Sequence, residues 1–288
     1  MHSKPSSPTV FGRGTVRTCL RGSRNSIVLV ALARPHVKNA FNNDVYEDLI
    51  EILHWTSRDP SVAAVVLTGS GSYFSSGADL KGGTFEPEPR GRQTIHKPAG
   101  RFMMSVIAYP KILAAAVNGP AVGIATTTLM HCDLVYCSPT ATFWAPFTRL
   151  ALVPELCSSA TFMATMGLSK ANELLLMGKK IDALTAVQWN LCSQIVRGVD
   201  VSGDPFHRES LANKMCRELD ERLLSLPSGE RTAEYFVQMV KGSRRTQLEK
   251  ICREELHKLD ERFDTGQVSE AASALKIGSQ AKANRSRL

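Results

Sequence analysis

Four short runs of mostly aliphatic residues constrain the fold of this chain most strongly. They lie at residues 27–32, 63–67, 112–117 and 134–137. A strand without a polar face is typical of a parallel sheet that is covered on both sides. Between the first two runs, apolar residues recur at a helical spacing behind Asn42 and Asn43, either of which can cap a helix. This alternation predicts an α/β fold with βαβ units and a mostly parallel sheet.

The chain changes character toward its C-terminal end. Residues 82–100 are rich in proline, glycine and charge, which predicts a mobile surface loop. From Arg208 onward the sequence is basic and amphipathic, and it offers no further strand candidate. We therefore expect an N-terminal segment at 1–24 that holds a first hairpin strand, an α/β core at 25–205 and a helical region at 206–288.

Composition limits the classes of function. The net charge of +8 and the isoelectric point of about 9.2 indicate a general affinity for anions, which is compatible with a phosphate-bearing cofactor, with nucleic acid or with neither. The seven cysteines form no CxxC pair, which indicates reduced intracellular thiols rather than a zinc site. No apolar run reaches the roughly 20 residues that a membrane-spanning helix needs.

Formal charges are rare between residues 118 and 159, where only Asp133, Arg149 and Glu155 carry one. A lone carboxylate in apolar surroundings is a candidate proton shuttle, because burial disfavours its charged form. Two glycine-containing turns, at 73–80 and 118–124, each follow a predicted strand, and a helix is expected to start near Ala121. Two N–H groups from such turns can hold one developing oxyanion. The alternatives are that these glycines only make tight turns and that Glu155 only caps a helix ahead of Ser158.

The order of these segments and their residue sequences resemble those of the crotonase (enoyl-CoA hydratase/isomerase) superfamily. The resemblance rests on Arg34-Pro35 with Lys38-Asn39-Ala40-Phe41, on residues 74–80, on residues 118–123 and on Cys132-Asp133, and it extends from about Ile27 to Gln194. It implies a spiral of ββα units, a C-terminal helical trimerisation region and an acyl-CoA substrate. It implies no metal or redox cofactor, since CoA arrives as part of the substrate.

The resemblance also assigns site residues. The oxyanion donors would be the N–H groups of Ala78 and Ile124. The CoA side would be lined by Lys38, Ala40, Ala78, Asp79, Leu80, Lys81, Gly82 and Gly123. The alternative for Lys38 and Lys81 is a solvated surface lysine. His131 is expected to be packed rather than catalytic, and Asp133 is expected to order a turn.

Side chains decide the reaction within this superfamily. Hydratases resemble one another in two glutamates, and Thr127 and Phe147 stand at those positions here. Neither side chain can replace a carboxylate in acid/base catalysis. Glu155 lies in Pro-Glu-Leu-Cys-Ser-Ser, which resembles the segment that carries the single base of peroxisomal Δ3,Δ2-enoyl-CoA isomerases.

The resemblance therefore implies that Glu155 moves a proton from C2 to C4 of a 3-enoyl-CoA during unsaturated fatty-acid β-oxidation. The alternatives are hydration or another crotonase-type reaction, and a non-catalytic acyl-CoA- or RNA-binding oligomer. A homotrimer or a dimer of trimers is expected.

The chain ends in Ser286-Arg287-Leu288, which is similar to the S-K-L peroxisomal address. This predicts recognition by a peroxisomal import receptor and location in a peroxisome or glycosome. The first acidic residue is Asp44, so the basic N-terminal segment also resembles a transit peptide, and the mitochondrion is the alternative.

Overall fold

The computed structural model describes residues 7–80, 93–201 and 203–274. Its main sheet has seven strands in the order β1-β2-β3-β4-β5-β7-β10. Their bounds are Thr9–Phe11 (β1), Val16–Arg21 (β2), Ile27–Leu32 (β3), Ala64–Gly69 (β4), Ile112–Val117 (β5), Leu134–Cys137 (β7) and Gln194–Ile195 (β10). All neighbours from β3 to β10 are parallel, while β2 is antiparallel to both of its neighbours, β1 and β3. The mostly parallel sheet and the N-terminal hairpin are confirmed.

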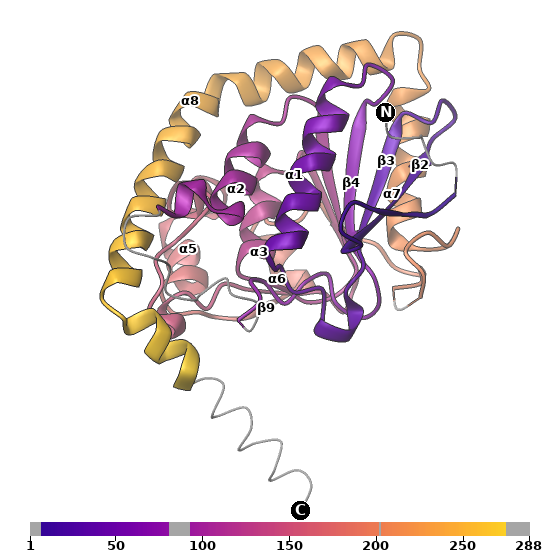
Figure 1. Ribbon diagram of the computed structural model, residues 1–288. Coiled ribbons are helices and arrows are strands. Elements are labelled where there is room, and N and C mark those ends of the chain that lie inside the picture. The colour runs from indigo at the N-terminus through magenta and orange to yellow at the C-terminus, as the bar shows by residue number, and fades with distance from the viewer. Residues whose placement is uncertain (1–6, 81–92, 202, 275–288) are drawn as a thin grey trace, which may run out of the picture.

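Helices cover both faces of this sheet, which explains why its central strands lack a polar face (Figure 1). Val28, Val65 and Leu113 pack with α1 (Asn43–Arg58) and α2 (Pro98–Ala108) in one core. The next residues of the same strands face α7 (Leu211–Leu219) in a second core. The expected cap of α1 is Asn42, whose side chain accepts a hydrogen bond from the N–H of Val45 at 3.0 Å.

A second, three-stranded sheet lies beside the first. It consists of β6 (Ala121–Val122), β8 (Thr142–Trp144) and β9 (Ile181–Asp182). The expected helix start near Ala121 is therefore wrong, because Ala121 and Val122 pair with β8 and the helix α3 (Ile124–Thr128) begins after Gly123. The remaining helices of this half are α4 (Ser158–Met166), α5 (Leu168–Leu175) and α6 (Ala183–Gln188).

Short helical turns connect several of these elements. They are η1 (Pro35–Val37), η2 (Thr94–His96), η3 (Leu129–His131), η4 (Thr148–Leu150) and η5 (Asp220–Leu224). The expected loop at 82–100 is wrong for its last part, because η2 and the start of α2 occupy it. Proline is well suited to the first turn of a helix, as at Pro98, so the proline that indicated a loop here starts α2 instead.

The long helix α8 (Gly229–Asp264) follows η5 and passes along the outside of the molecule from the α7 side past α2 (Figure 1). It is anchored in its first half and near its C-terminal end. Lys241 forms an ion pair with Asp133 at 2.8 Å, and Asp260 accepts the N–H of Thr94 at 3.0 Å. The predicted helical character after Arg208 is thus confirmed for the described residues. None of the described helices combines the length and the apolarity that a bilayer crossing requires. Ser286-Arg287-Leu288 lies outside the described residues.

Candidate active site

The two glycine-containing turns pack directly against each other at the carboxyl ends of β4 and β5. The N–H of Ser75 donates to the carbonyl oxygen of Pro120 at 3.1 Å, and the N–H of Val122 donates to that of Ser75 at 3.0 Å. Gly77 has φ +83° and approaches Val122 so closely that no Cβ fits between them. Both glycine turns therefore have a packing reason as well as a conformational one.

This packing brings Ala78 and Ile124 to one cavity of about 230 Å³. The N–H of Phe41 donates to Gly77 and the N–H of Asp79 donates to Phe41, both at 2.8 Å, so the N–H of Ala78 points away from Phe41. Ile124 is the first residue of α3, and the first N–H groups of a helix have no acceptor within it. Neither amide donates a hydrogen bond to an acceptor among the described residues.

The cavity wall is mostly apolar, and it is built from elements that lie far apart in the sequence. Met103 of α2, Trp144 of β8 and Phe147 contribute to it. Leu259 and Phe263 close it from the C-terminal half of α8. Water is scarce in such surroundings, so hydrogen bonds and charges inside are stronger than at the surface.

Glu155 lines the same cavity and is the only carboxylate among the described residues that do so. Burial, and in second place the charge of Glu255, raise its pKa from the ordinary value of 4.5 to about 8. The Glu155 carboxylate forms no ion pair or hydrogen bond with another described residue. The pKa of the buried Tyr46 hydroxyl is raised by burial and by the charge of Glu155, so this tyrosine stays protonated beside it.

The carboxylate that caps α4 is Glu255 rather than Glu155. Glu255 accepts hydrogen bonds from the N–H groups of Cys157 at 2.6 Å and of Ser159 at 2.9 Å. The N–H of Glu155 donates to the hydroxyl of Ser158 at 3.1 Å, but the Glu155 side chain takes no part in the cap. The Glu155 carboxylate is thus not used in capping α4 and lines the cavity instead.

The two positions at which hydratases resemble one another hold no acid/base group here. Thr127 is fully buried, and its hydroxyl donates to the carbonyl oxygen of Ile124 at 3.2 Å. Phe147 is part of the cavity wall. Neither residue can activate water in this arrangement.

The residues expected on the CoA side are only partly brought together. Leu80 and Gly123 line the cavity with Ala78. Asp79 instead forms an ion pair with Arg34 at 3.2 Å, and the carbonyl oxygen of Ala40 accepts a hydrogen bond from the same guanidinium at 2.6 Å. These two residues shape the turn beside the cavity rather than its wall.

Lys38 is exposed, with its ammonium nitrogen 5.0 Å from the ring centroid of Tyr73, and it is not part of the cavity wall. Lys81 and Gly82 lie outside the described residues.

Sequence reasoning missed several lining residues. Tyr46 follows Val45 in α1, and its place beside an apolar position of a helix could have marked it. Lys97, Leu259 and Phe263 carried no such mark. Only the tertiary packing of α8 brings the last two to the site.

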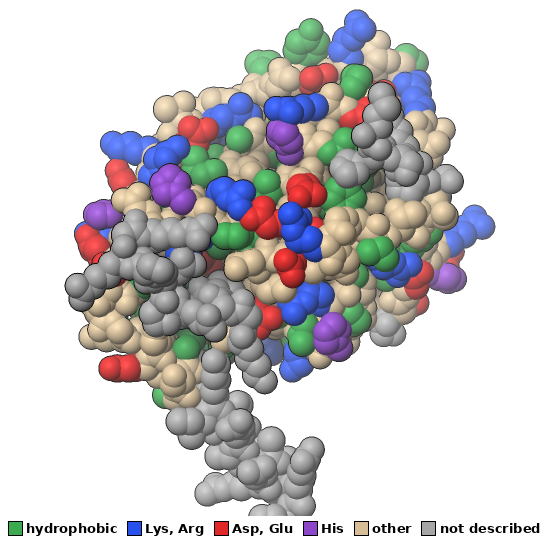
Figure 2. Space-filling model, in the orientation of Figure 1, with side chains coloured by type: hydrophobic (Ala, Val, Ile, Leu, Met, Phe, Trp, Pro, Cys, Tyr) green, Lys and Arg blue, Asp and Glu red, His purple; other side chains and the backbone are tan. Residues whose placement is uncertain are grey.

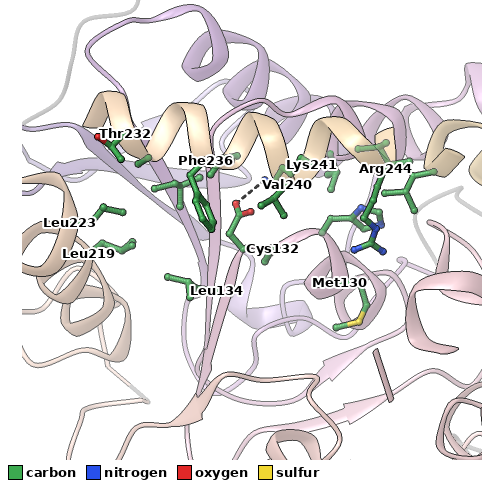
Figure 3. A pocket seen from close by; sticks show the side chains of 18 residues that line it. Met130, Cys132, Leu134, Leu219, Leu223, Thr232, Phe236, Val240, Lys241 and Arg244 are labelled. Carbon is green, nitrogen blue, oxygen red and sulfur yellow. Dashed lines mark ion pairs between the residues drawn. The ribbon is translucent and has the colours of Figure 1, made fainter. Parts of the chain in front are cut away.

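A larger cavity of about 580 Å³ lies between α8 and the first residues of β5 and β7 (Figure 3). Its wall is mostly apolar, and it is crossed by the ion pair between Lys241 and Asp133. Asp133 also accepts the N–H of Leu113 at 2.8 Å, which ties the residue before β7 to the neighbouring strand β5. None of the residues expected at the active site lines this cavity. Within the described residues, no three His, Cys, Asp or Glu side chains gather in a way that could hold a metal ion.

Comparison with known proteins gives three findings. A family model for enoyl-CoA hydratase/isomerase matches residues 22–223. Enoyl-CoA delta isomerase 2 of Rattus norvegicus is 41% identical over 179 residues, which cover 60% of this chain and 44% of that protein. Peroxisomal enoyl-CoA delta isomerase 3 of Mus musculus is 40% identical over 178 residues, which cover 60% of this chain and 55% of that protein. The chain spans about half the length of these curated relatives.

A solved structure is similar to this chain over more of its length than these curated relatives are. The crystal structure of an enoyl-CoA hydratase/isomerase from Pseudoalteromonas atlantica T6c superposes with a TM-score of 0.78 at 27% identity. The superposition covers 92% of this chain and 97% of the other. The C-terminal helices, which the family model leaves out in part, therefore have a counterpart in that structure.

Proposed function

The chain belongs to the enoyl-CoA hydratase/isomerase family, and we propose that it acts as a Δ3,Δ2-enoyl-CoA isomerase. One observation carries this proposal: Glu155 is the single carboxylate among the described residues that line the cavity reached by the amides of Ala78 and Ile124. Moving a double bond by proton transfer needs one base, whereas adding water across it needs groups for both the water and the α-carbon. The enoyl-CoA delta isomerases among the relatives support the same reaction.

Each residue has a defined part in the reaction. The Glu155 carboxylate takes a proton from C2 of a bound 3-enoyl thioester, and the electron pair of the broken C–H bond moves into a dienolate. The N–H groups of Ala78 and Ile124 stabilise the negative charge on the thioester oxygen. The protonated Glu155 then gives the same proton to C4, which leaves the double bond between C2 and C3. Conjugation with the thioester favours this product.

The properties of Glu155 suit this sequence of steps. A pKa of about 8 makes its carboxylate a stronger base than an exposed glutamate, and the protonated form is readily reached during turnover. The apolar wall also keeps the dienolate from bulk water, which limits protonation by solvent. The proton taken from C2 is thereby returned to C4 of the same substrate molecule rather than exchanged with solvent.

The nearest rival is hydration of a 2-enoyl-CoA. Incubating the purified protein with a 3-enoyl-CoA and, separately, with a 2-enoyl-CoA distinguishes the two reactions by product analysis. We expect the 3-enoyl ester to become the 2-trans-enoyl ester and the 2-enoyl ester to gain no water. Water addition to the 2-enoyl ester, with the 3-enoyl ester left unchanged, would refute the proposal.

A rival of another class is an RNA- or acyl-CoA-binding oligomer without catalysis. The net charge of +8 motivates it, but on the face drawn in Figure 2 basic side chains are interspersed with acidic ones. Arg13, for instance, pairs with Glu51 at 2.9 Å. A single basic stripe is the footprint expected of nucleic-acid binding. Steeply salt-dependent RNA binding without turnover would favour this rival.

We also propose import into a peroxisome and assembly into trimers. Import is supported by the terminal Ser286-Arg287-Leu288 and by the relative named as peroxisomal. Assembly is supported by exposed apolar side chains on α8, namely Tyr235, Phe236, Met239 and Val240. Unchanged location after deletion of the last three residues contradicts the first proposal, and a monomer in sedimentation experiments contradicts the second.

A further inference from the structure

The turn that carries Glu155 has an unfavourable backbone conformation at two consecutive residues. Leu156 has φ 51° and Cys157 has φ 60°, both in the left-handed region that disfavours residues with a side chain. Such conformations persist where surrounding contacts over-determine them, and they concentrate at functional sites. The contacts that fix this turn therefore bear directly on where the Glu155 carboxylate points.

Two groups from outside the turn fix its backbone. The neutral ring of the buried His131 donates from Nε2 to the carbonyl oxygen of Leu156 at 2.9 Å. Its pKa is lowered to about 4, chiefly by burial, so the ring stays neutral over the physiological range. Glu255 of α8 accepts from Cys157 and Ser159 on the other side of the turn. Glu255 belongs to α8, which also forms part of the cavity wall through Leu259 and Phe263.

We propose that Glu255 is a positioning residue for Glu155. It holds the two amides that follow Glu155 and places a second negative charge behind the catalytic carboxylate, so that Glu155 stays directed into the cavity as a strong base. This inference rests on the proposed isomerase function for its link to catalysis. Its structural part, the effect of Glu255 on the protonation of Glu155, is independent of any turnover.

The charges around Glu155 support a role for Glu255 in setting its basicity. The charge of Glu155 interacts with that of Glu255 in α8 and with the neutral Tyr46 in α1, and the neutral His131 of η3 contacts the next residue, Leu156. Lys97 and Arg149 also line the cavity, but neither forms an ion pair with either carboxylate in the described part of the chain. Burial raises the pKa of Glu255 overall, and the hydrogen bonds from Ser159 and Cys157 oppose that shift in part. Like charges at close range disfavour ionisation of the second group.

Glu255→Gln tests the proposal because it keeps the size of the side chain, removes its charge and leaves one acceptor for two amides. We expect kcat for the 3-enoyl ester to fall by about ten-fold, since a misdirected base loses much of its rate advantage. We also expect the pH profile of kcat/KM to move toward lower pH by roughly 0.5 to 1 unit as the like charge disappears. Glu254→Gln is the matched control, because Glu254 is the exposed neighbour on the same helix. It should leave both readouts at their wild-type values.

A second readout separates this inference from the proposed function. The carboxyl carbon of Glu155 can be titrated by NMR in protein labelled at glutamate side chains, with its signal assigned by its loss in Glu155→Gln. We expect its pKa to be lower in Glu255→Gln than in the wild type, whether or not the protein turns over a 3-enoyl ester. An inactive wild type with this shift overturns the isomerase proposal alone, and the same Glu155 pKa in both proteins overturns the positioning role.

If Glu255→Gln does not fold, Glu255→Asp provides a second test, because it keeps the charge on a shorter side chain. We expect the pH profile of this variant to remain as in the wild type while kcat falls, because the amides are held less well. A purely structural role predicts otherwise: lower thermal stability for Glu255→Gln or Glu255→Asp, with kcat and the pH profile of the folded fraction unchanged. That result would overturn the proposal.

Discussion

A Cβ atom on Gly77 would lie 2.6 Å from the carbonyl oxygen of Val122. This close approach joins the turn that carries Ala78 to the strand that leads into Ile124. The relative position of the two amides is therefore set by backbone packing rather than by a side chain. Such a contact is rigid, as an oxyanion site requires, because preorganised donors need no rearrangement as charge develops.

Gly77→Ala is expected to separate the two turns and to misplace the Ala78 amide. The new methyl group must push Val122 away, and φ +83° is itself unfavourable for alanine. We expect the free energy of unfolding to fall by about 1 to 3 kcal/mol and kcat for the 3-enoyl ester to fall by about 100-fold. Urea unfolding and steady-state kinetics measure the two effects.

Gly167→Ala is the control for this variant, because Gly167 has φ +81° with no atom within 4 Å of a new Cβ. It carries the conformational cost without the clash, and it lies between α4 and α5. We expect a smaller loss of stability and wild-type kcat. Equal kinetics for both alanine variants would show that the contact with Val122 does not set the catalytic geometry.

The pH dependence of the reaction should report Glu155. Because the base must be ionised and its pKa is raised to about 8, kcat/KM should increase as the pH rises from 6 through about 8 and then level off. Initial rates with a 3-enoyl-CoA in constant-ionic-strength buffers between about pH 5.5 and 9.5 provide the measurement. A profile that is flat above pH 6 contradicts the assignment.

Glu155 should also make folding stability depend on pH. Its pKa is raised in the folded protein, so its contribution to stability is fully present below about pH 4.5 and is lost as the pH rises through about 8. Glu155→Gln lacks this loss. The unfolding free energy of Glu155→Gln minus that of the wild type should therefore increase by about 1.4 kcal/mol for each pH unit between about pH 4.5 and 8. Urea titrations at pH 5, 6.5 and 8 test this, and parallel curves for the two proteins would exclude a raised pKa.

Lys38→Ala tests the expected CoA side of the cavity. Lys38 is exposed, so we expect only a small loss of binding, with KM raised by about three-fold and kcat unchanged. Lys170→Ala is the matched control, because Lys170 is also exposed and has its ammonium nitrogen 6.0 Å from the ring centroid of Trp189, outside the cavity. The same KM for both variants supports the alternative of a solvated surface lysine.

The fold was predictable because its determinants are local. The central strands are apolar throughout, since both faces of the sheet are covered, and Asn42 caps α1 as its position suggests. Together with the motif resemblance, this was enough to identify the crotonase-like α/β fold, which the family match and the superposed structures confirm. The start of α3 was misplaced because pairing with β8 overrides the local preference of Ala121.

The candidate site was predictable only in part. The glycine turns and the lone carboxylate Glu155 are visible in the sequence, and the family resemblance assigned the donors Ala78 and Ile124; all three residues line one cavity. Glu255 could not be selected, because its partner Cys157 is 98 residues away and no local pattern links them. The same holds for Leu259 and Phe263, whose place in the wall depends on how α8 packs.

The central claim is that Glu155 alone moves the proton, and Glu155→Gln tests it most directly. The conversion of a 3-enoyl-CoA to the 2-trans-enoyl-CoA should be followed at about pH 9, where the wild-type base with its pKa of about 8 is mostly ionised. We predict a kcat about 100- to 10,000-fold below that of the wild type, with KM little changed and the circular dichroism spectrum retained. A folded Glu155→Gln protein that keeps kcat within about two-fold of the wild type would contradict the account.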